Sequence, residues 1–513
     1  MGACLPSTAN AGPVFPGATI RVDTSVDSFD VVGECSLRSA VYAADKDVAT
    51  GGCPGGKPEY VYMTNGYPSS GYPTIPYNYD TIYVPRGTYR LTLGGPDEDN
   101  GRTGDLDVSG SSGLNVRPSG KQQKVTIDGM KSDRIFDVDK SAFPAGSYPG
   151  GMYLKKMTLT QGRSSEGGRD EGGGALRVHG ASAGGYGLLL TDNTSAGDGG
   201  AVAGYDSSLD LKSSTVSGNR AGRSGGGIYM DDSSPKASRT DYLSGVTVAF
   251  NRADADGDSI GDGGGVAAAR YGSVSFSNSI LSNNSVDSGA KSASDCWIRQ
   301  PGSHADFTLS TQRLGTSRCQ MNVIRALAAA DPKLEPLADN GGQTRTHALP
   351  TGSPAIGANR MLSSSNRFSC EEIDQRGLFR ALGSCDVGAF QLKTVGAARH
   401  ETTSLATTDG RYLYLQVRCP KQFEPACRMK LTPRFGKGLK AIDDPDFYTI
   451  RSGEQWGFNY RIKRRDTSRI VALTRTSGYI GMELRINART RSGKRMDKPV
   501  TIFRGYKLVR LVG

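Results

Sequence analysis

The stretch GDGGAVAGYDSSLDLKSSTVSGN, residues 197–219, decides the fold class. A Gly-Gly pair opens a short apolar segment, segments of alternating apolar and polar residues follow, and an asparagine ends the unit. Short alternating strands separated by small turn residues are typical of β structure, and helical periodicity is absent here. A unit of this length cannot bury its apolar face alone, so it must stack on a neighbouring unit. The stretch therefore predicts one coil of a parallel β-solenoid.

The same unit recurs on both sides of this stretch. Gly-Gly pairs begin at residues 173, 199, 226 and 264, at spacings of 26, 27 and 38 residues. Strands between or after these pairs end near an asparagine, at Asn193, Asn219, Asn251 or Asn284. Asparagines at equivalent turns are expected to form a hydrogen-bonded ladder, and the glycines to supply turns with positive φ. A phosphate-binding glycine loop would need a helix directly after the glycines, and none is apparent.

A solenoid needs covers at its ends, because open ends invite pairing with other chains. In residues 36–44, SLRSAVYAA, apolar residues recur at helical spacing, and Ser36 suits the N-cap of a short amphipathic helix. The segment 331–392 is rich in turn residues and is expected to cover the last coil. We therefore expect an N-terminal cap over residues 1–60 and a parallel β-helix over residues 61–392.

The pattern changes beyond residue 395, where the Gly-Gly pairs are replaced by longer alternating segments. These segments are residues 411–419, 457–465, 470–476, 481–490 and 499–512. They predict a small antiparallel β-sandwich over residues 396–513. Residues 393–513 contain 26 Lys and Arg against 10 Asp and Glu, a net charge of +16, and the whole-chain charge of +11 then leaves −5 for residues 1–392.

The spacing of the cysteines favours an exported protein. Eight of the nine cysteines fall into near neighbours, which are Cys35 and Cys53, Cys296 and Cys319, Cys370 and Cys385, and Cys419 and Cys427. Four such pairs predict short-loop disulfides in an extracellular or cell-surface protein, and free buried thiols in a cytosolic protein are the alternative. Cys4 follows no signal-peptide pattern. It is a lipid-anchor remnant, a residue near a mature N-terminus, or an ordinary thiol. No apolar run reaches the ~18–20 residues of a transmembrane span.

Several phrases match one bacterial family in order along the chain. They are CSLR (35–38), DTIYVPRGTYRLTL (80–93), GDLDV (104–108), VTIDG (125–129), the Gly-Gly coils, Asp295-Cys296, DNGGQTRTHALPTGSPAIGA (339–358), DQRG (374–377) and CDVGAFQ (385–391). On these residues the chain resembles the bacterial right-handed β-helix proteins that carry a CSLR N-terminal motif and a choice-of-anchor Q segment. Its Gly-Gly phrases are also similar to those of the chlamydial polymorphic membrane proteins. The resemblance implies an all-β, right-handed parallel β-helix and export, but no particular activity.

The loop NRADADGDSIGD, residues 251–262, is the strongest candidate for a metal site. The distance from the repeating asparagine to the second glycine is 7 residues in one coil, 8 in the next and 14 here, so about six residues are inserted. The insert contains Asp254, Asp256, Asp258 and Asp262. Alternating carboxylates around a glycine suit Ca²⁺, and a solvated acidic turn is the alternative. A second acidic stretch, residues 96–107, is expected to be a structural turn, with a metal site as the alternative.

An enzyme on this scaffold would need charged groups that converge across coils. Uronate lysis needs a base and a positive group that stabilises the enolate. Its candidates are Arg177, His179, Lys212, Arg270 and Tyr271. Glycoside hydrolysis needs two carboxylates about 5–10 Å apart. Its candidates are Asp192, Asp210, Asp231 and Asp232. Neither set forms a compact motif, so the catalytic residues stay undetermined.

The basic C-terminal region indicates an anionic partner such as teichoic acid, acidic polysaccharide or lipid head groups. The expected contact residues are Lys463, Arg464, Arg465, Arg489, Arg491, Lys494 and Arg495. No nucleic-acid recognition motif is present. The tyrosine-rich residues 56–79 either stack on sugars or pack on the solenoid flank. The leading hypothesis is a non-enzymatic secreted or surface protein that binds an extracellular polymer; the alternative is a polysaccharide lyase or glycoside hydrolase that acts on an acidic polysaccharide in the β-helix groove.

Overall fold

The structure, a computed structural model, divides into two compact units, residues 1–392 and 393–513, which are described separately. In the first unit it describes residues 17–392 without 58–78, 96–99, 111–112, 121–122, 143–150, 166, 169, 235–240, 288–294, 300–301, 312–313, 315, 317, 361–370, 372, 379 and 381–383. In the second unit it describes the strands alone.

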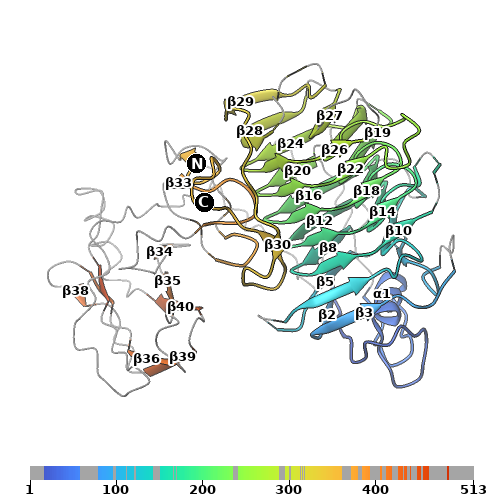
Figure 1. Cartoon of the computed structure of the whole chain (residues 1–513). Coiled ribbons are helices and arrows are strands. Elements are labelled where there is room, and N and C mark those ends of the chain that lie inside the picture. The colour runs from blue at the N-terminus through green and yellow to red at the C-terminus, as the bar shows by residue number, and fades with distance from the viewer. Residues whose placement is uncertain are drawn as a thin grey trace, which may run out of the picture. The chain divides into compact units, whose positions relative to one another are not determined.

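Three stacks of parallel strands and a short corner ladder build the first unit (Figure 1). Sheet 1 contains β1 (Thr19–Arg21), β2 (Asp80–Val84), β5 (Leu114–Pro118), β8 (Met152–Lys155), β12 (Ser182–Tyr186), β16 (Ser208–Lys212), β20 (Asp241–Ser244), β24 (Val274–Ser277), β28 (His304–Ser310) and β29 (Asn322–Ala326). Sheet 2 contains β3 (Gly87–Arg90), β6 (Val125–Asp128), β9 (Thr158–Thr160), β13 (Leu189–Thr191), β17 (Thr215–Ser217), β21 (Thr247–Ala249) and β25 (Ile280–Ser282). Sheet 3 contains β4 (Leu106–Val108), β7 (Phe136–Asp139), β11 (Leu176–His179), β15 (Val202–Tyr205), β19 (Ile228–Asp232), β23 (Val266–Arg270) and β27 (Cys296–Ile298). The corner ladder contains β10 (Arg163–Ser164), β14 (Thr194–Ser195), β18 (Arg220–Ala221), β22 (Arg252–Ala253) and β26 (Ser285–Val286).

The chain visits these sheets in the same order in successive coils. After β12 it passes through β13, β14 and β15, and β16 then pairs in parallel with β12. This return path makes the unit a parallel β-helix, which confirms the predicted fold class. Leu176, Val202 and Ile228 occupy equivalent positions in successive coils of sheet 3, and all three are buried. Because each coil stacks its apolar residues on the next, one continuous core runs through the unit.

The predicted asparagine ladder is confirmed, and it extends to an aspartate. Each side-chain amide donates from Nδ2 to the Oδ1 of the next member, at 3.0 Å from Asn193 to Asn219, 2.8 Å to Asn251 and 2.9 Å to Asn284. Asn284 then donates to Asp295 over 2.9 Å. All five side chains are buried. The ladder therefore satisfies polar groups inside the corner between sheet 2 and the corner ladder.

The predicted N-terminal helix is α1 (Leu37–Lys46). Its N-cap Ser36 accepts a hydrogen bond from the Ser39 N–H over 3.0 Å, and it ends at Asp47, whose φ of 56° is left-handed. The helix buries its apolar residues in the same cluster as the first coils. It therefore packs on the start of the β-helix core, as the sequence indicated.

The arginine of the CSLR motif fixes this helix to the first coil. Arg38 is 1% exposed, and its Nε lies 2.8 Å from Oδ1 of Asp27. Its guanidinium also donates to the carbonyls of Thr103, Gly104 and Asp105, at 3.0, 2.8 and 2.8 Å. A planar group with several fixed donors suits such a set of acceptors better than a lysine would. The motif is thus explained by helix docking.

Two of the four predicted disulfides, Cys35–Cys53 and Cys296–Cys319, are confirmed. Cys385 is also disulfide-bonded, and its expected partner Cys370 lies outside the described residues. The pairing of Cys419 with Cys427 cannot be read from the described side chains and stays a prediction.

Replacing both Cys35 and Cys53 with serine is expected to lower the free energy of unfolding by about 3 kcal/mol. The bond joins residues 18 apart in sequence, and a closed loop of this size restricts the unfolded chain by about that amount. Urea unfolding under oxidising conditions measures the loss. Hydrogen exchange should localise the weakening to α1, and an unchanged unfolding midpoint would contradict the prediction.

The segment 331–392 lies along the outer side of sheet 2. Near one end of the β-helix Gln343 donates to the carbonyl of Gln123 over 2.8 Å, and further along Gln375 accepts from the Thr215 hydroxyl over 2.6 Å. A small apolar cluster joins the segment to later coils through Ile280, Leu309, Leu349, Ala355, Val387 and Phe390. Two antiparallel pairs belong to this segment, β30 (Leu337–Ala338) with β31 (Thr346–His347) and β32 (Asn359–Arg360) with β33 (Ser384–Cys385). This placement corrects the expectation of a cover over the last coil: the outward hydroxyl groups of sheet 2 offer hydrogen-bond partners over several coils.

The second unit contains antiparallel strand pairs, as the alternating sequence predicts. They are β34 (Leu405–Ala406) and β40 (Gln455–Arg461) on β35 (Tyr412–Arg418), β36 (Ala426–Lys430) with β39 (Phe447–Arg451), and β38 (Leu439–Lys440) and β41 (Met482–Leu484) on β37 (Pro433–Phe435). Their assembly into a sandwich stays a prediction. Within the described residues of the whole chain, no helix has the length and apolar character to cross a membrane.

Candidate functional site

The outward side chains of sheet 1, called here the sheet 1 face, form the candidate site. Successive residues of a strand point to opposite sides, so alternate residues line this face. One row contains Thr81, Asn115, Tyr153, Gly184, Asp210, Tyr242 and Ser275 at equivalent positions of successive coils. The second row contains Arg21, Tyr83, Arg117, Lys155, Tyr186, Lys212, Ser244 and Ser277. Most of these residues are half-buried or exposed, which distinguishes them from the buried inward rows.

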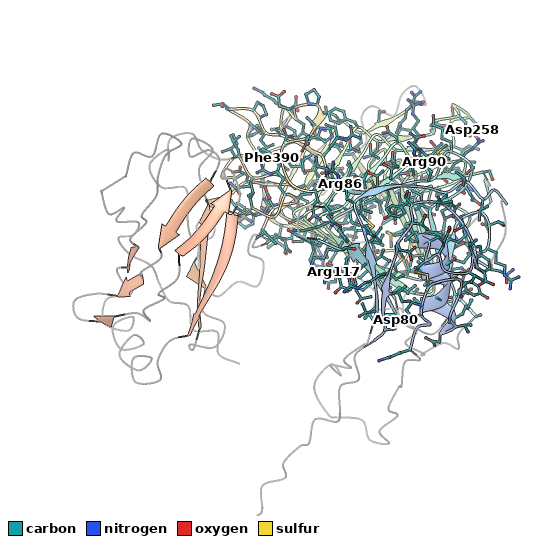
Figure 2. The ribbon with its side chains drawn as sticks, turned by 90° about the horizontal axis from the view of Figure 1, so that it is seen from below. Asp80, Arg86, Arg90, Arg117, Asp258 and Phe390 are labelled. Carbon is teal, nitrogen blue, oxygen red and sulfur yellow. A yellow bond between two sulfur atoms is a disulfide. The ribbon has the colours of Figure 1, made fainter. Side chains whose placement is uncertain are left out.

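A tyrosine between two arginines marks the N-terminal part of the face. The guanidinium carbons of Arg21 and Arg117 lie 4.9 and 5.7 Å from the ring centroid of Tyr83. Figure 2 labels Arg117 together with Arg86 and Arg90, which lie outside the face; Arg90 belongs to β3 in sheet 2. Cation–π contacts of this kind hold the charged groups beside the ring. An aromatic surface flanked by guanidinium groups suits a sugar ring that carries a carboxylate.

Two lysines continue the positive charge. Burial, followed by the nearby charge of Arg117, lowers the pKa of Lys155. Burial also lowers the pKa of Lys156, and Lys155 and Arg117 add to this effect. The Nζ of Lys156 lies 5.7 Å from the ring centroid of Tyr186. Burial is the larger cause of both shifts, and the neighbouring cations add to it, so three positive groups are close together at this part of the face.

The middle of the face exposes two further tyrosines. A Cβ at Gly184 would lie 3.1 Å from Cδ2 of Tyr153, so the glycine leaves room for the Tyr153 ring against the sheet. Tyr242 is 54% exposed one coil beyond Asp210. Asp210 itself is paired with Lys212 over 3.0 Å, and both side chains are partly exposed. Aromatic, acidic and basic groups therefore alternate along a surface that repeats with each coil.

Two of the catalytic candidates from the sequence, Arg177 and His179, lie together on β11 in sheet 3 rather than on the sheet 1 face. Arg177 is paired with Asp137 over 2.7 Å and with Asp139 over 3.2 Å. His179 lies 3.5 Å from the Asp139 carboxylate, a contact that raises the pKa of His179. Burial acts to raise the pKa of Asp139, but the hydrogen bonds from His179 and Ser141, together with the charge of His179, outweigh it and lower the pKa. Arg177 and His179 are therefore paired with the carboxylates of Asp137 and Asp139.

The remaining catalytic candidates, Lys212, Arg270 and Tyr271, do not form a group with the two residues on β11. Arg270 on β23 is bound to the buried Asp231 over 2.6 Å. Tyr271 follows β23 and is exposed, and Lys212 lies in sheet 1. The structure therefore brings Arg177 and His179 together and places Lys212 on another side of the β-helix.

The four carboxylates considered for glycoside hydrolysis lie on three sides of the molecule. Asp192 follows β13 of sheet 2, Asp210 lies on β16 of sheet 1, and Asp231 and Asp232 end β19 of sheet 3. The pair needed across a groove is not formed by this set, so the prediction from stacking was wrong.

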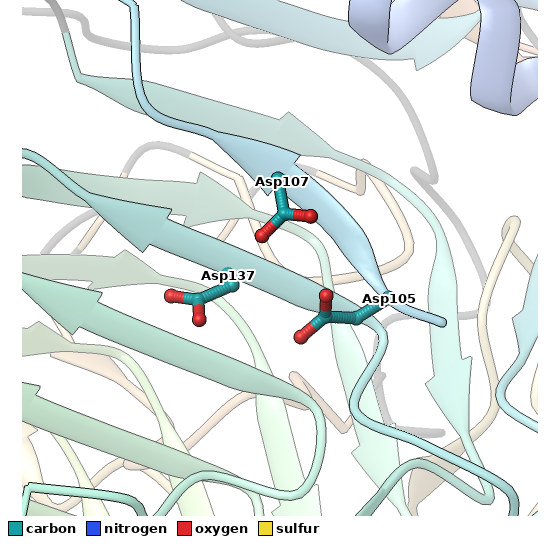
Figure 3. A group of neighbouring side chains, drawn as sticks. All are labelled: Asp105, Asp107 and Asp137. Carbon is teal, nitrogen blue, oxygen red and sulfur yellow. The ribbon is translucent and has the colours of Figure 1, made fainter. Parts of the chain in front are cut away.

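Three other carboxylates converge in sheet 3. Oxygen atoms of Asp105, Asp107 and Asp137 lie within 4.8 Å of one another, and Figure 3 shows the three side chains grouped on and beside β4 and β7. The Nη1 of Arg134 lies 3.1 Å from the Asp105 carboxylate and 2.8 Å from that of Asp137. Burial raises the pKa of Asp105 to about 7, although Arg134 acts to lower it. Because Arg134 and Arg177 supply positive charge to Asp105 and Asp137, these two carboxylates belong to an internal ion-pair network, whereas Asp107 accepts a hydrogen bond from the Gly101 N–H over 2.7 Å.

In the loop 251–262 the structure brings together Asp254, Asp256 and Asp258, with oxygen atoms within 4.8 Å of one another. Asp262 is not a member of that group, although the sequence analysis included it.

Other predicted contact residues lie outside the described part of the chain. They are Cys4, the basic residues 463–465 and 489–495, and residues 58–78 of the tyrosine-rich stretch. Comparison with known proteins finds no matching family model, curated protein or solved structure. The family resemblance of the motifs therefore stays an expectation, and the site must be interpreted from its own chemistry.

Sequence reasoning considered Tyr83 as a sugar-stacking residue together with the tyrosine-rich stretch, but it missed Arg117, Lys155, Tyr153 and Tyr242 of the sheet 1 face. The signal was available in the strands DTIYV, LNVRP and MYLK, each of which alternates buried apolar residues with an outward aromatic or basic residue. Their relation became clear only from the register, which stacks these outward positions. Spacing between the corresponding strands is irregular in sequence, so it did not reveal the alignment.

Proposed function

We propose that the chain is an exported protein that binds an acidic polysaccharide along its sheet 1 face. The observation that carries the proposal is the position of Tyr83 beside the cations Arg117 and Lys155 in one outward row of sheet 1, with Tyr153 and Tyr242 in the neighbouring row. Neighbouring coils are about 4.8 Å apart, so this surface repeats regularly along the solenoid. A polymer of repeating charged sugars can engage several coils at once, and weak contacts then add up through multivalency.

Two further features support this proposal. The disulfides favour an oxidising compartment, where extracellular polymers are found. The net charge of +16 in residues 393–513 favours a second contact with an anionic envelope polymer through Lys463, Arg464, Arg465, Arg489, Arg491, Lys494 and Arg495. In this view the role is adhesive or structural, at the cell surface or outside the cell.

Arg117→Gln and Tyr242→Ala are each expected to weaken binding of polygalacturonate by about tenfold, which corresponds to about 1.4 kcal/mol. The first removes a charge-assisted contact with a carboxylate, and the second removes an exposed stacking surface. Calorimetric titration of the full chain at low salt measures the affinity. Arg90→Gln is the matched control, because Arg90 is exposed but belongs to sheet 2. Equal affinities of the wild type, Arg117→Gln and Arg90→Gln variants would contradict the proposal.

A uronate lyase is the second candidate, favoured by the lowered pKa of Lys155 beside Arg117. Lys155 as the base would remove the proton next to the uronate carboxylate, and the bond to the leaving sugar oxygen would break as the carbon–carbon double bond forms. The protonated lysine would then return this proton to the leaving oxygen. Arg117 would stabilise the enolate. Unsaturated uronates absorb in the near ultraviolet, so the same incubation separates the two functions. Product that disappears in Lys155→Met establishes the lyase; retention without product supports the binding function.

A further inference from the structure

The loop between β22 and β23 is fixed to the preceding coil by its backbone. The Asp254 N–H donates to the Arg223 carbonyl over 2.9 Å, and the Ala255 N–H donates to the Ala221 carbonyl over 2.9 Å. At the far end the Asp262 N–H donates to the Ser224 hydroxyl over 3.1 Å. Because the loop is held at both ends, its carboxylates have defined starting positions.

Those carboxylates converge. Asp254, Asp256 and Asp258 each place one carboxylate oxygen within 4.8 Å of the others. Asp254 is fully buried, whereas Asp256 and Asp258 are exposed. Three like charges at this separation repel one another, and a cation among them removes the repulsion.

The buried member has an oxygen without a partner. Oδ1 of Asp254 accepts a hydrogen bond from the Ser259 N–H over 3.0 Å, but Oδ2 is buried and accepts none. A buried carboxylate oxygen that lacks a donor costs free energy, and native structures rarely leave one unsatisfied. The hydrogen bond within the turn satisfies Oδ1 of Asp254 but not its Oδ2. Oδ2 therefore needs a partner that the described residues of the chain do not provide.

Backbone donors orient the two exposed members. Oδ1 of Asp256 accepts from the Asp258 N–H over 3.3 Å, and Oδ1 of Asp258 accepts from the Ile260 N–H over 2.7 Å. Gly257 lies between them with a φ of +77° and with nothing near its Cβ position, so a left-handed turn is the reason for this glycine. The chain thus presents three carboxylates from alternate residues around a tight turn.

We propose that Asp254, Asp256 and Asp258 bind one Ca²⁺ ion. The donor set is all oxygen, which suits a hard cation and not the nitrogen and sulfur preference of zinc. Ca²⁺ accepts six to eight ligands in flexible geometry, and water can complete the shell on the exposed side of Asp256 and Asp258. Mg²⁺ requires near-ideal octahedral geometry and gives up water reluctantly, so it binds more weakly here. The bound ion stabilises the turn of residues 254–258, and the backbone of this loop is held to residues 221–224 of the previous coil by hydrogen bonds.

Titration of the chelator-treated full chain with CaCl₂ tests this site, independently of polymer binding. Calorimetry is expected to show one site, with a rise in the thermal midpoint and stronger hydrogen-exchange protection at residues 254–262. The double variant Asp256→Asn/Asp258→Asn is expected to weaken Ca²⁺ binding by at least about tenfold. Asp192→Asn is the matched control, because Asp192 is an exposed turn carboxylate at positive φ, which asparagine also tolerates. It should bind Ca²⁺ as the wild type does.

Asp254→Asn tests the buried ligand in the same way, and the exposed pair keeps the test valid if this variant folds poorly. Unchanged Ca²⁺ affinity in the double variant would overturn the proposal, as would the absence of heat and of a thermal shift in the wild type at millimolar CaCl₂. Equal shifts by MgCl₂ and CaCl₂ that persist in the double variant would reduce the effect to general charge screening, and would also overturn it.

Discussion

Asn219→Leu is expected to lower the free energy of unfolding of the β-helix by about 3–5 kcal/mol. Oδ1 of Asn219 accepts from both the backbone and the side-chain N–H groups of Asn193, at 3.0 Å each. Its Nδ2 donates to Oδ1 of Asn251 over 2.8 Å and to the carbonyl of Leu190 over 3.0 Å. Leucine has a similar size but satisfies none of these groups. Each buried polar group that loses its partner costs about 1–3 kcal/mol, and partial relaxation reduces the total.

Urea unfolding monitored by circular dichroism measures this loss, and hydrogen exchange should show the greatest weakening at β13 and β17. Asn115→Leu is the matched control, since Asn115 lies half-buried on the sheet 1 face and its Oδ1 has no hydrogen-bond partner among the described residues. Its expected cost is below about 1 kcal/mol. If both variants lose the same stability, the ladder does not stabilise the stacked coils.

The sequence was sufficient for the β-helix because the coil leaves a local signature. Gly199-Gly200 and Asn219 recur in each unit, and their roles depend on backbone turns and ladders that local spacing determines. The position of residues 331–392 could not be inferred in this way. Its contacts, such as Gln375 with Thr215, join residues 160 apart, and no local pattern encodes them.

Less of the candidate site than of the fold could be predicted from the sequence. Asp254, Asp256 and Asp258 are close in sequence, so their proximity was predictable. The sheet 1 face depends on register across coils of unequal length, which places Tyr83 beside Arg117. Strand residues such as Arg177 are polar for a different reason, because they belong to an ion-pair network in sheet 3. Residue type alone does not distinguish these two environments.

In the ion-pair network of sheet 3, Arg134→Met is expected to lower the free energy of unfolding by about 3–5 kcal/mol near pH 8. Arg134 is buried and contacts both Asp105 and Asp137 at 3.1 and 2.8 Å. Its removal leaves buried carboxylates next to one another without their shared counter-charge. Arg90→Met is the matched control, because the Arg90 side chain is 59% exposed and lies 4.0 Å from its carboxylate partner. That variant should change stability by less than about 0.5 kcal/mol.

The cost of Arg134→Met should shrink as the pH falls from about 8 to about 5. Burial already raises the pKa of Asp105 to about 7 in the folded wild type, and Arg134 acts in the opposite direction, so the variant raises this pKa further. A group whose folded pKa lies above its unfolded value stabilises the fold at low pH, and this contribution is lost as the pH rises through the folded pKa. Protonated Asp105 needs no counter-charge, so the part of the cost that comes from Asp105 is lost in acid, whereas the part that comes from the contact of Arg134 with Asp137 remains. Urea unfolding of the wild type and both variants at several pH values measures the difference. An equal deficit for Arg134→Met at pH 5 and pH 8 would show that the guanidinium acts through packing or through Asp137 and not through the charge of Asp105, which would contradict the prediction.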